Sequence, residues 1–159
     1  MLATHPAACT RLEAEDDESF VDQVLLESLR LYPPIWIVER RAVRDDQLGG
    51  TKIPRRASVV VSPYVLHRQP TYWDAPDAFR PERFVGGEPP DEAKRVYLPF
   101  GIGPRRCIGQ HFAMVESRLV LATLARRFRL EPVSGHVVVP EPGITLRLRD
   151  GLPMRIHRR

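Results

Sequence analysis

A single cysteine, Cys107, lies in the run Phe100-Gly101-Ile102-Gly103-Pro104-Arg105-Arg106-Cys107-Ile108-Gly109, directly before an apolar segment with helical periodicity. The two arginines before the cysteine and the helix N-terminus after it both favour the anionic form of the sulfur. A soft anionic sulfur is a good ligand for iron or another thiophilic metal. Glycines have no Cβ, so those on either side would let the backbone come close to a large flat molecule. These residue types indicate a metal or cofactor site.

Other interpretations of Cys107 fit its surroundings less well. Most free cysteines are buried structural thiols, but this one has a basic, glycine-flanked setting. A phosphatase-like anion loop needs an arginine six positions after the cysteine, where this chain has Ala113. Cys107 and His111 have the spacing of a zinc pair on a helix, yet no second ligand pair follows. A dinucleotide loop at Gly101 and Gly103 lacks a clean preceding strand and the remaining glycine pattern.

The same run matches the signature of a known family. Read as F-x-x-G-x-R-x-C-x-G, it resembles the haem-binding signature of the cytochrome P450 family at Phe100, Gly103, Arg105, Cys107 and Gly109. Such a dense pattern is far more specific than a lone G-x-G.

Segments upstream resemble further motifs of this family in the expected order. Glu27-Ser28-Leu29-Arg30 resembles the E-x-x-R of its K helix, and Pro81-Glu82-Arg83-Phe84 resembles its P-E-R-F segment. Between them, His67-Arg68-Gln69-Pro70 and Tyr72-Trp73 resemble the usual approach to that segment. The similarity extends from about His5 to the C-terminus.

The resemblance implies haem b as the cofactor, with Cys107 as the axial iron ligand and catalytic residue. Thiolate ligation donates electron density to the iron and favours O–O cleavage in the open position opposite. Arg105 would pair with a haem propionate, and Phe100 would pack near the sulfur side of the ring and restrict water. Gly103 and Gly109 would let backbone N–H groups approach the sulfur.

Glu27 and Arg30 are three residues apart, so they share a helix face, which Leu26 and Leu31 border. Flanking leucines suggest that the pair is buried, whereas an exposed pair would contribute only ~0.2–0.5 kcal/mol. The resemblance implies a buried triad with Arg83 that joins the helix to the P-E-R-F segment and supports the haem loop.

Several other polar residues are candidates for secondary roles. Arg40 and His67 are further candidates for the propionates, and Arg106 is expected to face solvent or a partner. In the family, the helix after the cysteine lies near the face where electron donors dock. A positive face there would suit an acidic ferredoxin or flavoprotein.

The resemblance implies a haem-thiolate monooxygenase that inserts one oxygen atom from O2 into a small, apolar organic substrate. A peroxygenase or isomerase activity is the alternative within the same chemistry. Family members are usually more than twice this length, and the acidic-alcohol pair of their oxygen-activating I helix has no counterpart in residues 1–26. The chain could therefore be a truncated, non-catalytic haem-binding fragment or a split-gene partner.

Composition argues against several other classes of protein. The chain has 159 residues, 43% of them hydrophobic and 28% charged, which fits one folded domain. Its net charge of +4 comes from scattered arginines without a reader motif, which argues against nucleic-acid binding. Two cysteines, Cys9 and Cys107, cannot form a disulfide framework and predict a reducing compartment, the cytoplasm. No apolar run is long enough to span a membrane, and no signal pattern begins the chain.

Hydrophobic periodicity predicts the elements that must position these groups. Thr4 is expected to cap the first helix and Ser19 to open the second, with an acidic connection over 13–18 between them. Asp150-Gly151, between two alternating runs, is typical of a β-hairpin. The expected helices cover residues 5–14, 19–31, 64–68 and 108–128, the strands 35–43, 57–62, 145–149 and 152–157, and a long ordered meander 69–99.

The expected fold class is α+β, mainly α with a small β-sheet. By resemblance it is the proximal, C-terminal half of the cytochrome P450 fold, one domain over 1–159 with the N-terminal and I-helix regions absent. Its parts would be a K-type helix, β-strands, the meander, the cysteine-ligand loop, a long L-type helix and a C-terminal β-hairpin.

Overall fold

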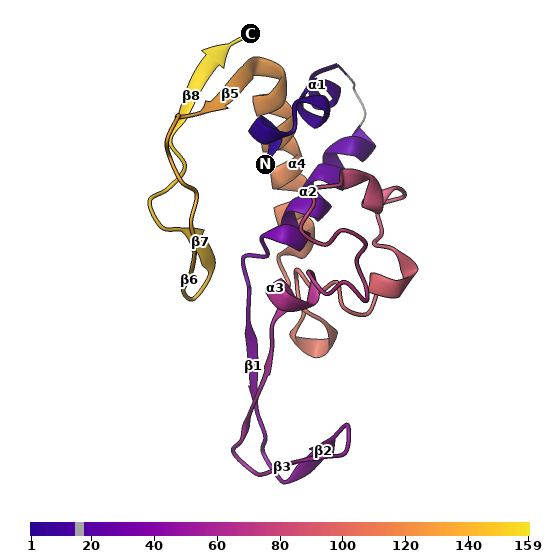
Figure 1. Cartoon of the computed structure of the whole chain (residues 1–159). Helices are drawn as coiled ribbons and strands as arrows, with labels where there is room; N and C mark the ends of the chain where they lie inside the picture. The colour runs from indigo at the N-terminus through magenta and orange to yellow at the C-terminus, as the bar shows by residue number, and fades with distance from the viewer. Residues whose placement is uncertain (15–17) are drawn as a thin grey trace.

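The computed structural model describes residues 1–14 and 18–159. Within them, four α-helices and four two-stranded antiparallel sheets confirm the expected mixture of α and β structure. Figure 1 shows the three longer helices gathered together, with the β1–β4 ladder projecting away from them and the last strands forming a separate arm. The elements are α1 (Pro6–Ala14), α2 (Glu18–Leu31), β1 (Val38–Arg41), β2 (Asp46–Leu48), β3 (Thr51–Ile53), β4 (Ser58–Val61), α3 (Pro63–Leu66), α4 (Gln110–Arg127), β5 (Phe128–Pro132), β6 (Pro140–Pro142), β7 (Leu146–Leu148) and β8 (Met154–Arg158).

Helix α2 lies at the centre of the fold because its apolar residues pack against α4 and share one core cluster with Leu12 of α1. Small side chains of α4, among them Ala122 and Ala125, let that helix approach α2 closely. A second cluster of Trp73, Phe84 and Ala93 forms under the meander, which wraps over the opposite side of α2. The main core cluster consists of Leu12, Phe20, Val21, Val24, Leu31 and Phe79.

Two expectations for the first helices need correction. The Thr4 hydroxyl donates to the Met1 carbonyl at 2.8 Å, so it closes the short turn before α1 and does not cap α1 itself. Helix α2 begins at Glu18, one residue before the expected Ser19. Part of the expected acidic connection, residues 15–17, lies outside the described residues.

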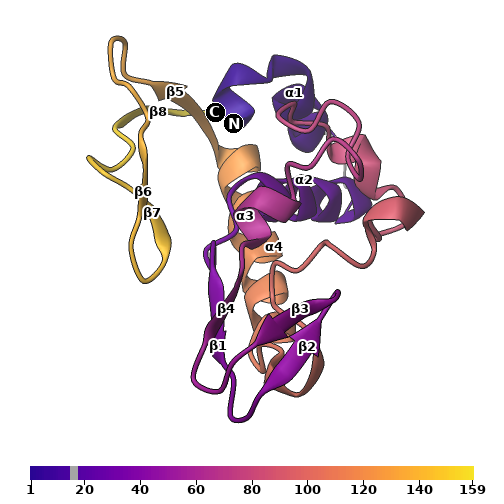
Figure 2. The ribbon, with the colours of Figure 1, turned by 60° about the horizontal axis from the view of Figure 1, so that its bottom comes forward.

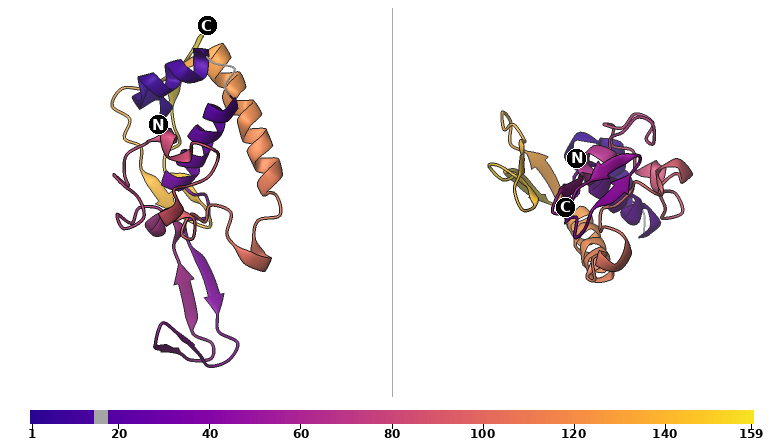
Figure 3. Two further views of the ribbon diagram at one scale, coloured as in Figure 1. Left: turned by 90° about the vertical axis from the view of Figure 1, so that its right-hand side faces the viewer. Right: turned by 90° about the horizontal axis from the view of Figure 1, so that it is seen from below.

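The first β region is an antiparallel pair, β1 with β4, in which Val38 lies opposite Val61. The chain turns at Gly49-Gly50, and both glycines have positive φ, 54° and 82°. This turn joins β2 and β3, two short strands at the tip of the ladder that the sequence pattern did not indicate. Figure 3 (left) shows the ladder extending from the end of α2 with this tip farthest away.

The expected C-terminal hairpin is wrong in its pairing. Gly151 turns the chain, with φ 73° and its N–H directed to the Leu148 carbonyl at 3.4 Å, but the runs on either side do not pair with each other. Instead β7 pairs with β6, and β8 pairs with β5, which continues directly from α4. Figure 2 shows this arm apart from the β1–β4 ladder. Alternation predicts a strand but does not choose its partner, and the free edge of β5 was available to β8.

Helix α4 carries the expected periodic apolar stripe, but that stripe is exposed. Phe112 and Leu119 expose 71% and 65% of their surface, while the side that packs on α2 presents Leu121, Ala122 and Ala125. Both sides of α4 are therefore apolar, and only one is covered by the described residues.

Candidate functional site

The Cys107 loop is closed by its own backbone. The Cys107 N–H donates to the Phe100 carbonyl at 2.9 Å, and the Arg106 N–H donates to the Gly103 carbonyl at 3.0 Å. Gly101 and Gly103 have φ of 73° and 70°, a left-handed conformation that strains any other residue. Cys107 lies three residues before the first residue of α4, and its side chain is exposed.

Cys107 lines an open pocket of about 590 Å³, a volume within the usual range of ligand sites. Three parts of the chain form it: the segment from Pro34 into β1, the junction of β4 and α3, and the loop itself. Its wall is mostly apolar. The lining residues are Pro34, Ile35, Val38, Arg40, Val61, Pro63, Leu98, Pro99, Phe100, Gly101, Ile102, Arg105 and Cys107.

Two guanidinium groups, those of Arg40 and Arg105, interrupt this apolar wall. Among the described residues, the Arg40 side chain donates only to the neighbouring Glu39 carbonyl, at 2.9 Å. The Arg105 side chain has no hydrogen-bond or ion-pair partner within the described part of the chain. Two cations without carboxylate partners beside an apolar wall suit a flat ligand that carries acidic groups.

His67, the other propionate candidate, does not reach the pocket. Its ring is fully buried between α2 and the segment before the loop. Nδ1 lies 3.1 Å from the Arg30 carbonyl oxygen, and Nε2 accepts the Leu98 N–H at 2.8 Å. Burial lowers the pKa of His67 to about 4, so the ring is neutral at pH 7 and unsuited to pair with a carboxylate.

The structure brings Glu27, Arg30 and Arg83 together across 56 residues of chain. Glu27 and Arg30 are fully buried, and the guanidinium meets both carboxylate oxygens at 2.6 and 2.8 Å. Arg83 Nε lies 3.4 Å from Glu27 Oε1 without a hydrogen bond, and its Nη2 donates to the Ala75 carbonyl. Burial lowers the pKa of Arg83, and the Glu27 carboxylate opposes that shift.

Arg30 has a partner for every one of its N–H groups. Besides its two bonds to Glu27, it donates to three backbone carbonyls: that of His67 after α3 (2.7 Å), and those of Pro76 (2.6 Å) and Ala78 (3.0 Å) in the meander. A guanidinium has five N–H donors, so this donor set is complete. The network fastens the meander to α2 on the side opposite the α1–α4 core.

The two signature glycines nearest the sulfur play different parts. Gly103 needs its positive φ of 70°, and no atom stands where its Cβ would be. Gly109 has an ordinary φ of −85°, and an added Cβ would lie 3.9 Å from Cys107 Sγ, in van der Waals contact. No backbone N–H donates a hydrogen bond to the sulfur among the residues that the structure covers.

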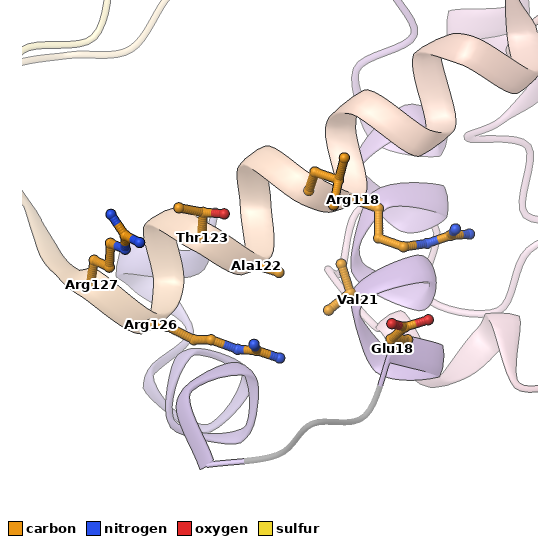
Figure 4. Close-up of a pocket in the computed structure, with 8 residues that line it drawn as sticks. Glu18, Val21, Arg118, Ala122, Thr123, Arg126 and Arg127 are labelled. Atoms are coloured by element: carbon orange, nitrogen blue, oxygen red, sulfur yellow. The ribbon is translucent and has the colours of Figure 1, made fainter.

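A second hollow, of about 300 Å³, lies between α2 and α4. Figure 4 shows Arg118 and Arg126 extending from α4 toward Glu18 and Val21 of α2, with Arg127 turned away. Arg118 forms a bidentate pair with Asp22, both distances 2.8 Å. This hollow contains none of the residues that the sequence assigned to chemistry.

The described residues contain no group of three or more His, Cys, Asp or Glu side chains that could hold a metal ion. None of the helices so described has the length and apolar character to cross a membrane.

Comparison with known proteins identifies the class. The chain matches the family model described as Cytochrome P450 over residues 13–154. Cyclooctatin synthase of Streptomyces melanosporofaciens is 38% identical over 92% of this chain and 35% of that protein. Cyclooctat-9-en-7-ol 5-monooxygenase of the same organism is 36% identical over 85% and 33%. Cytochrome P450 3A11 of Mus musculus is 37% identical over 82% and 29%.

The chain therefore belongs to the cytochrome P450 family. It spans about a third of the length of these curated relatives. Haem b is the cofactor of the family, and the residues around the pocket fit it. Its flat apolar ring suits the pocket wall, its two propionates suit Arg40 and Arg105, and its iron suits an exposed thiol.

Sequence reasoning missed some of the groups that position the loop. Tyr97 is buried, and its hydroxyl donates to the Leu26 carbonyl of α2 at 2.8 Å. The carbonyls of Pro76 and Ala78 accept hydrogen bonds from Arg30. A tyrosine just before the glycine-rich run is visible in the sequence and was a usable signal. Every residue has a backbone carbonyl, so the sequence does not show which carbonyls will accept from Arg30.

Proposed function

We propose that this chain is the haem-proximal, C-terminal part of a single cytochrome P450 domain, with Cys107 as the axial iron ligand. In this assignment α2 is the K-type helix and α4 the L-type helix that follows the ligand loop. The observation that carries the proposal is one pocket in which an exposed thiol and an apolar wall meet two cations that have no acidic partner among residues 1–14 and 18–159.

The residues of the chain would bind and orient the cofactor. Arg40 and Arg105 would each donate to a propionate, which fixes the ring in its plane. Phe100 would cover the sulfur side of the ring and keep water from it. Glu27, Arg30 and Arg83, which do not line the pocket, would hold the meander that precedes the loop.

The reaction we propose is insertion of one oxygen atom from O2 into a small, apolar organic substrate, with the second atom leaving as water. Two electrons from a donor and two protons balance the reaction. The haem supplies the oxygen chemistry when bound. The basic charge of the chain supports an acidic ferredoxin or flavoprotein as donor, and its two free cysteines support a reducing compartment such as the cytoplasm.

Ferrous–CO spectroscopy tests the ligand assignment. The chain loaded with haem, reduced and exposed to CO should show the red-shifted Soret band of thiolate ligation. Cys107→Ala should abolish that band, while Cys9→Ala, which removes the other free thiol, should retain it. A band unchanged in Cys107→Ala would reject Cys107 as the ligand.

A second candidate is a haem-binding chain without catalytic activity, or a partner that works with another polypeptide. The exposed apolar stripe of α4, with Phe112 and Leu119, favours it because apolar surface of this kind normally packs against protein. Under this candidate the purified chain with a competent electron donor forms no oxygenated product. Turnover of any substrate by the isolated chain would refute it.

A further inference from the structure

His67 occupies a buried position between the ionic network of α2 and the Cys107 loop. It directly follows α3, and its side chain has no exposed surface. The Trp73 and Tyr97 rings pack around it, with centroids 6.4 and 5.2 Å away. Neither the cofactor contacts nor the triad uses this histidine.

The hydrogen bonds of His67 define its proton. Nδ1 faces the Arg30 carbonyl, which can only accept, so Nδ1 carries the hydrogen. Nε2 faces the Leu98 N–H, which can only donate, so Nε2 carries a lone pair. In a protonated ring Nε2 would also carry a hydrogen, and that N–H would face the Leu98 N–H, so the two donors would repel each other. Only the neutral tautomer with its hydrogen on Nδ1 satisfies both partners.

Leu98 connects this ring to the cysteine loop. Its carbonyl accepts the Gly101 N–H at 3.1 Å, and the Phe100 carbonyl, two residues after Leu98, accepts the Cys107 N–H at 2.9 Å. At the other end, Arg30 Nη1 donates to the His67 carbonyl at 2.7 Å. A chain of hydrogen bonds therefore leads from Glu27 through Arg30 and His67 to Leu98. The backbone from Leu98 to Phe100 and the bond from the Cys107 N–H continue it to the cysteine.

We propose that His67 is a positioning residue for the Cys107 loop: its neutral Nδ1–H form ties the Leu98 amide to the C-terminal end of α2, and acidification breaks that tie. The charged groups facing the ring are Arg30 from α2 and the adjacent Arg68, and both disfavour a cation there. Tyr97, the titratable group from the segment before the loop, is a neutral phenol at these pH values, and burial raises its pKa further.

The pH range follows from the burial of the ring. An unfolded histidine titrates near pH 6.5, whereas burial lowers the pKa of His67 to about 4. As the pH falls from about 6.5 to 4, His67 becomes protonated in the unfolded chain while it stays neutral in the native one. The native state, and with it the hydrogen bond to Leu98, therefore becomes less stable relative to the unfolded chain. The difference corresponds to roughly a 300-fold change in the folding equilibrium, complete below pH 4.

Amide hydrogen exchange of the chain without haem tests the tie separately from the assignment of Cys107. In His67→Gln the amide oxygen can take the place of Nε2 and accept the Leu98 N–H. In His67→Asn the shorter side chain can replace Nδ1 but cannot reach Leu98. We expect exchange of the Leu98 amide to be at least tenfold faster in His67→Asn than in His67→Gln. The Tyr97 amide, which donates to the Ala93 carbonyl, serves as control and should be equally protected in both.

Equal Leu98 protection in the two variants would overturn the proposal. Should either variant fail to fold, ¹⁵N spectra of the unmodified chain decide. They should show an Nδ1–H tautomer that persists to about pH 4, with Leu98 protection lost as the ring titrates. An Nε2–H tautomer, or titration near pH 6.5 without any change at Leu98, would also reject it.

The proposal rests on the proposed function only in treating Cys107 as the iron ligand, and a haem experiment examines that link. With haem and CO, His67→Asn should show a several-fold smaller thiolate band than His67→Gln. Fast Leu98 exchange together with an unchanged band would retain the tie and reject its effect on the ligand. No thiolate band in the unmodified chain would reject the ligand assignment alone.

Discussion

Replacing Arg30 by methionine tests how much the buried ionic network contributes to stability. The substitution roughly preserves side-chain volume and removes five hydrogen bonds, two to Glu27 and three to the backbone carbonyls of His67, Pro76 and Ala78. Removing one partner of a buried pair typically costs about 3–5 kcal/mol. Glu27 keeps the Arg80 N–H at 2.8 Å and the Arg83 guanidinium at 3.4 Å, which compensate part of its charge.

The three carbonyls add to that cost, because each buried acceptor left without a donor costs about 1–3 kcal/mol unless water reaches it. We therefore expect Arg30→Met to lower the free energy of unfolding by at least about 4 kcal/mol. Domains of this size are stable by about 5–15 kcal/mol, so the variant would lie near the limit of folding.

Urea unfolding of the chain followed by far-UV circular dichroism measures the loss. Arg118→Met is the matched control, because Arg118 also forms a bidentate pair, with Asp22, but those side chains are 34% and 27% exposed. We expect this control to cost about 0.2–1 kcal/mol. If Arg30→Met does not fold, Arg30→Lys, which keeps the charge but only three donors, should give an intermediate loss. Equal losses for Arg30→Met and Arg118→Met would refute the reasoning.

Three further sets of substitutions test the loop and the residues that support it. Gly103→Ala, at φ 70°, should cost about 1–2 kcal/mol by thermal melting, whereas Gly109→Ala should change stability by less than about 1 kcal/mol; the reverse order would contradict the loop geometry. Arg105→Ala should weaken haem binding roughly tenfold in a spectroscopic titration, as should Arg40→Ala, and unaltered affinity in both would exclude them as propionate partners. Tyr97→Phe should lower the free energy of unfolding by about 0.5–1.5 kcal/mol in urea titrations, and a neutral result would mean that its bond to α2 is not needed.

Short-range features of the site could be read from the sequence. Phe100, Gly103, Arg105, Cys107 and Gly109 lie within ten residues, so covalent geometry and the start of a helix already bring them together. The helical expectation for α4 is confirmed because its apolar period is long and uninterrupted.

Longer-range contacts were beyond such reasoning. The period of α4 showed an apolar side but not that Ala122 and Ala125 would face α2 while Leu119 stayed exposed. Likewise Arg40 and His67 looked alike as propionate candidates. Tertiary packing put the first in the pocket and buried the second.

The amino-acid sequence by itself determined the family and the glycine-rich run around Cys107, because these depend on neighbours close along the chain. Only the tertiary structure decided that β8 pairs with β5, that Arg30 uses all five donors, and that His67 joins Arg30 to Leu98. The contacts of Arg30 with His67 and the meander, and that of His67 with Leu98, link segments that are 30 or more residues apart along the chain. They form because a buried polar group must find a partner wherever the fold places one, and spacing along the chain does not encode that position.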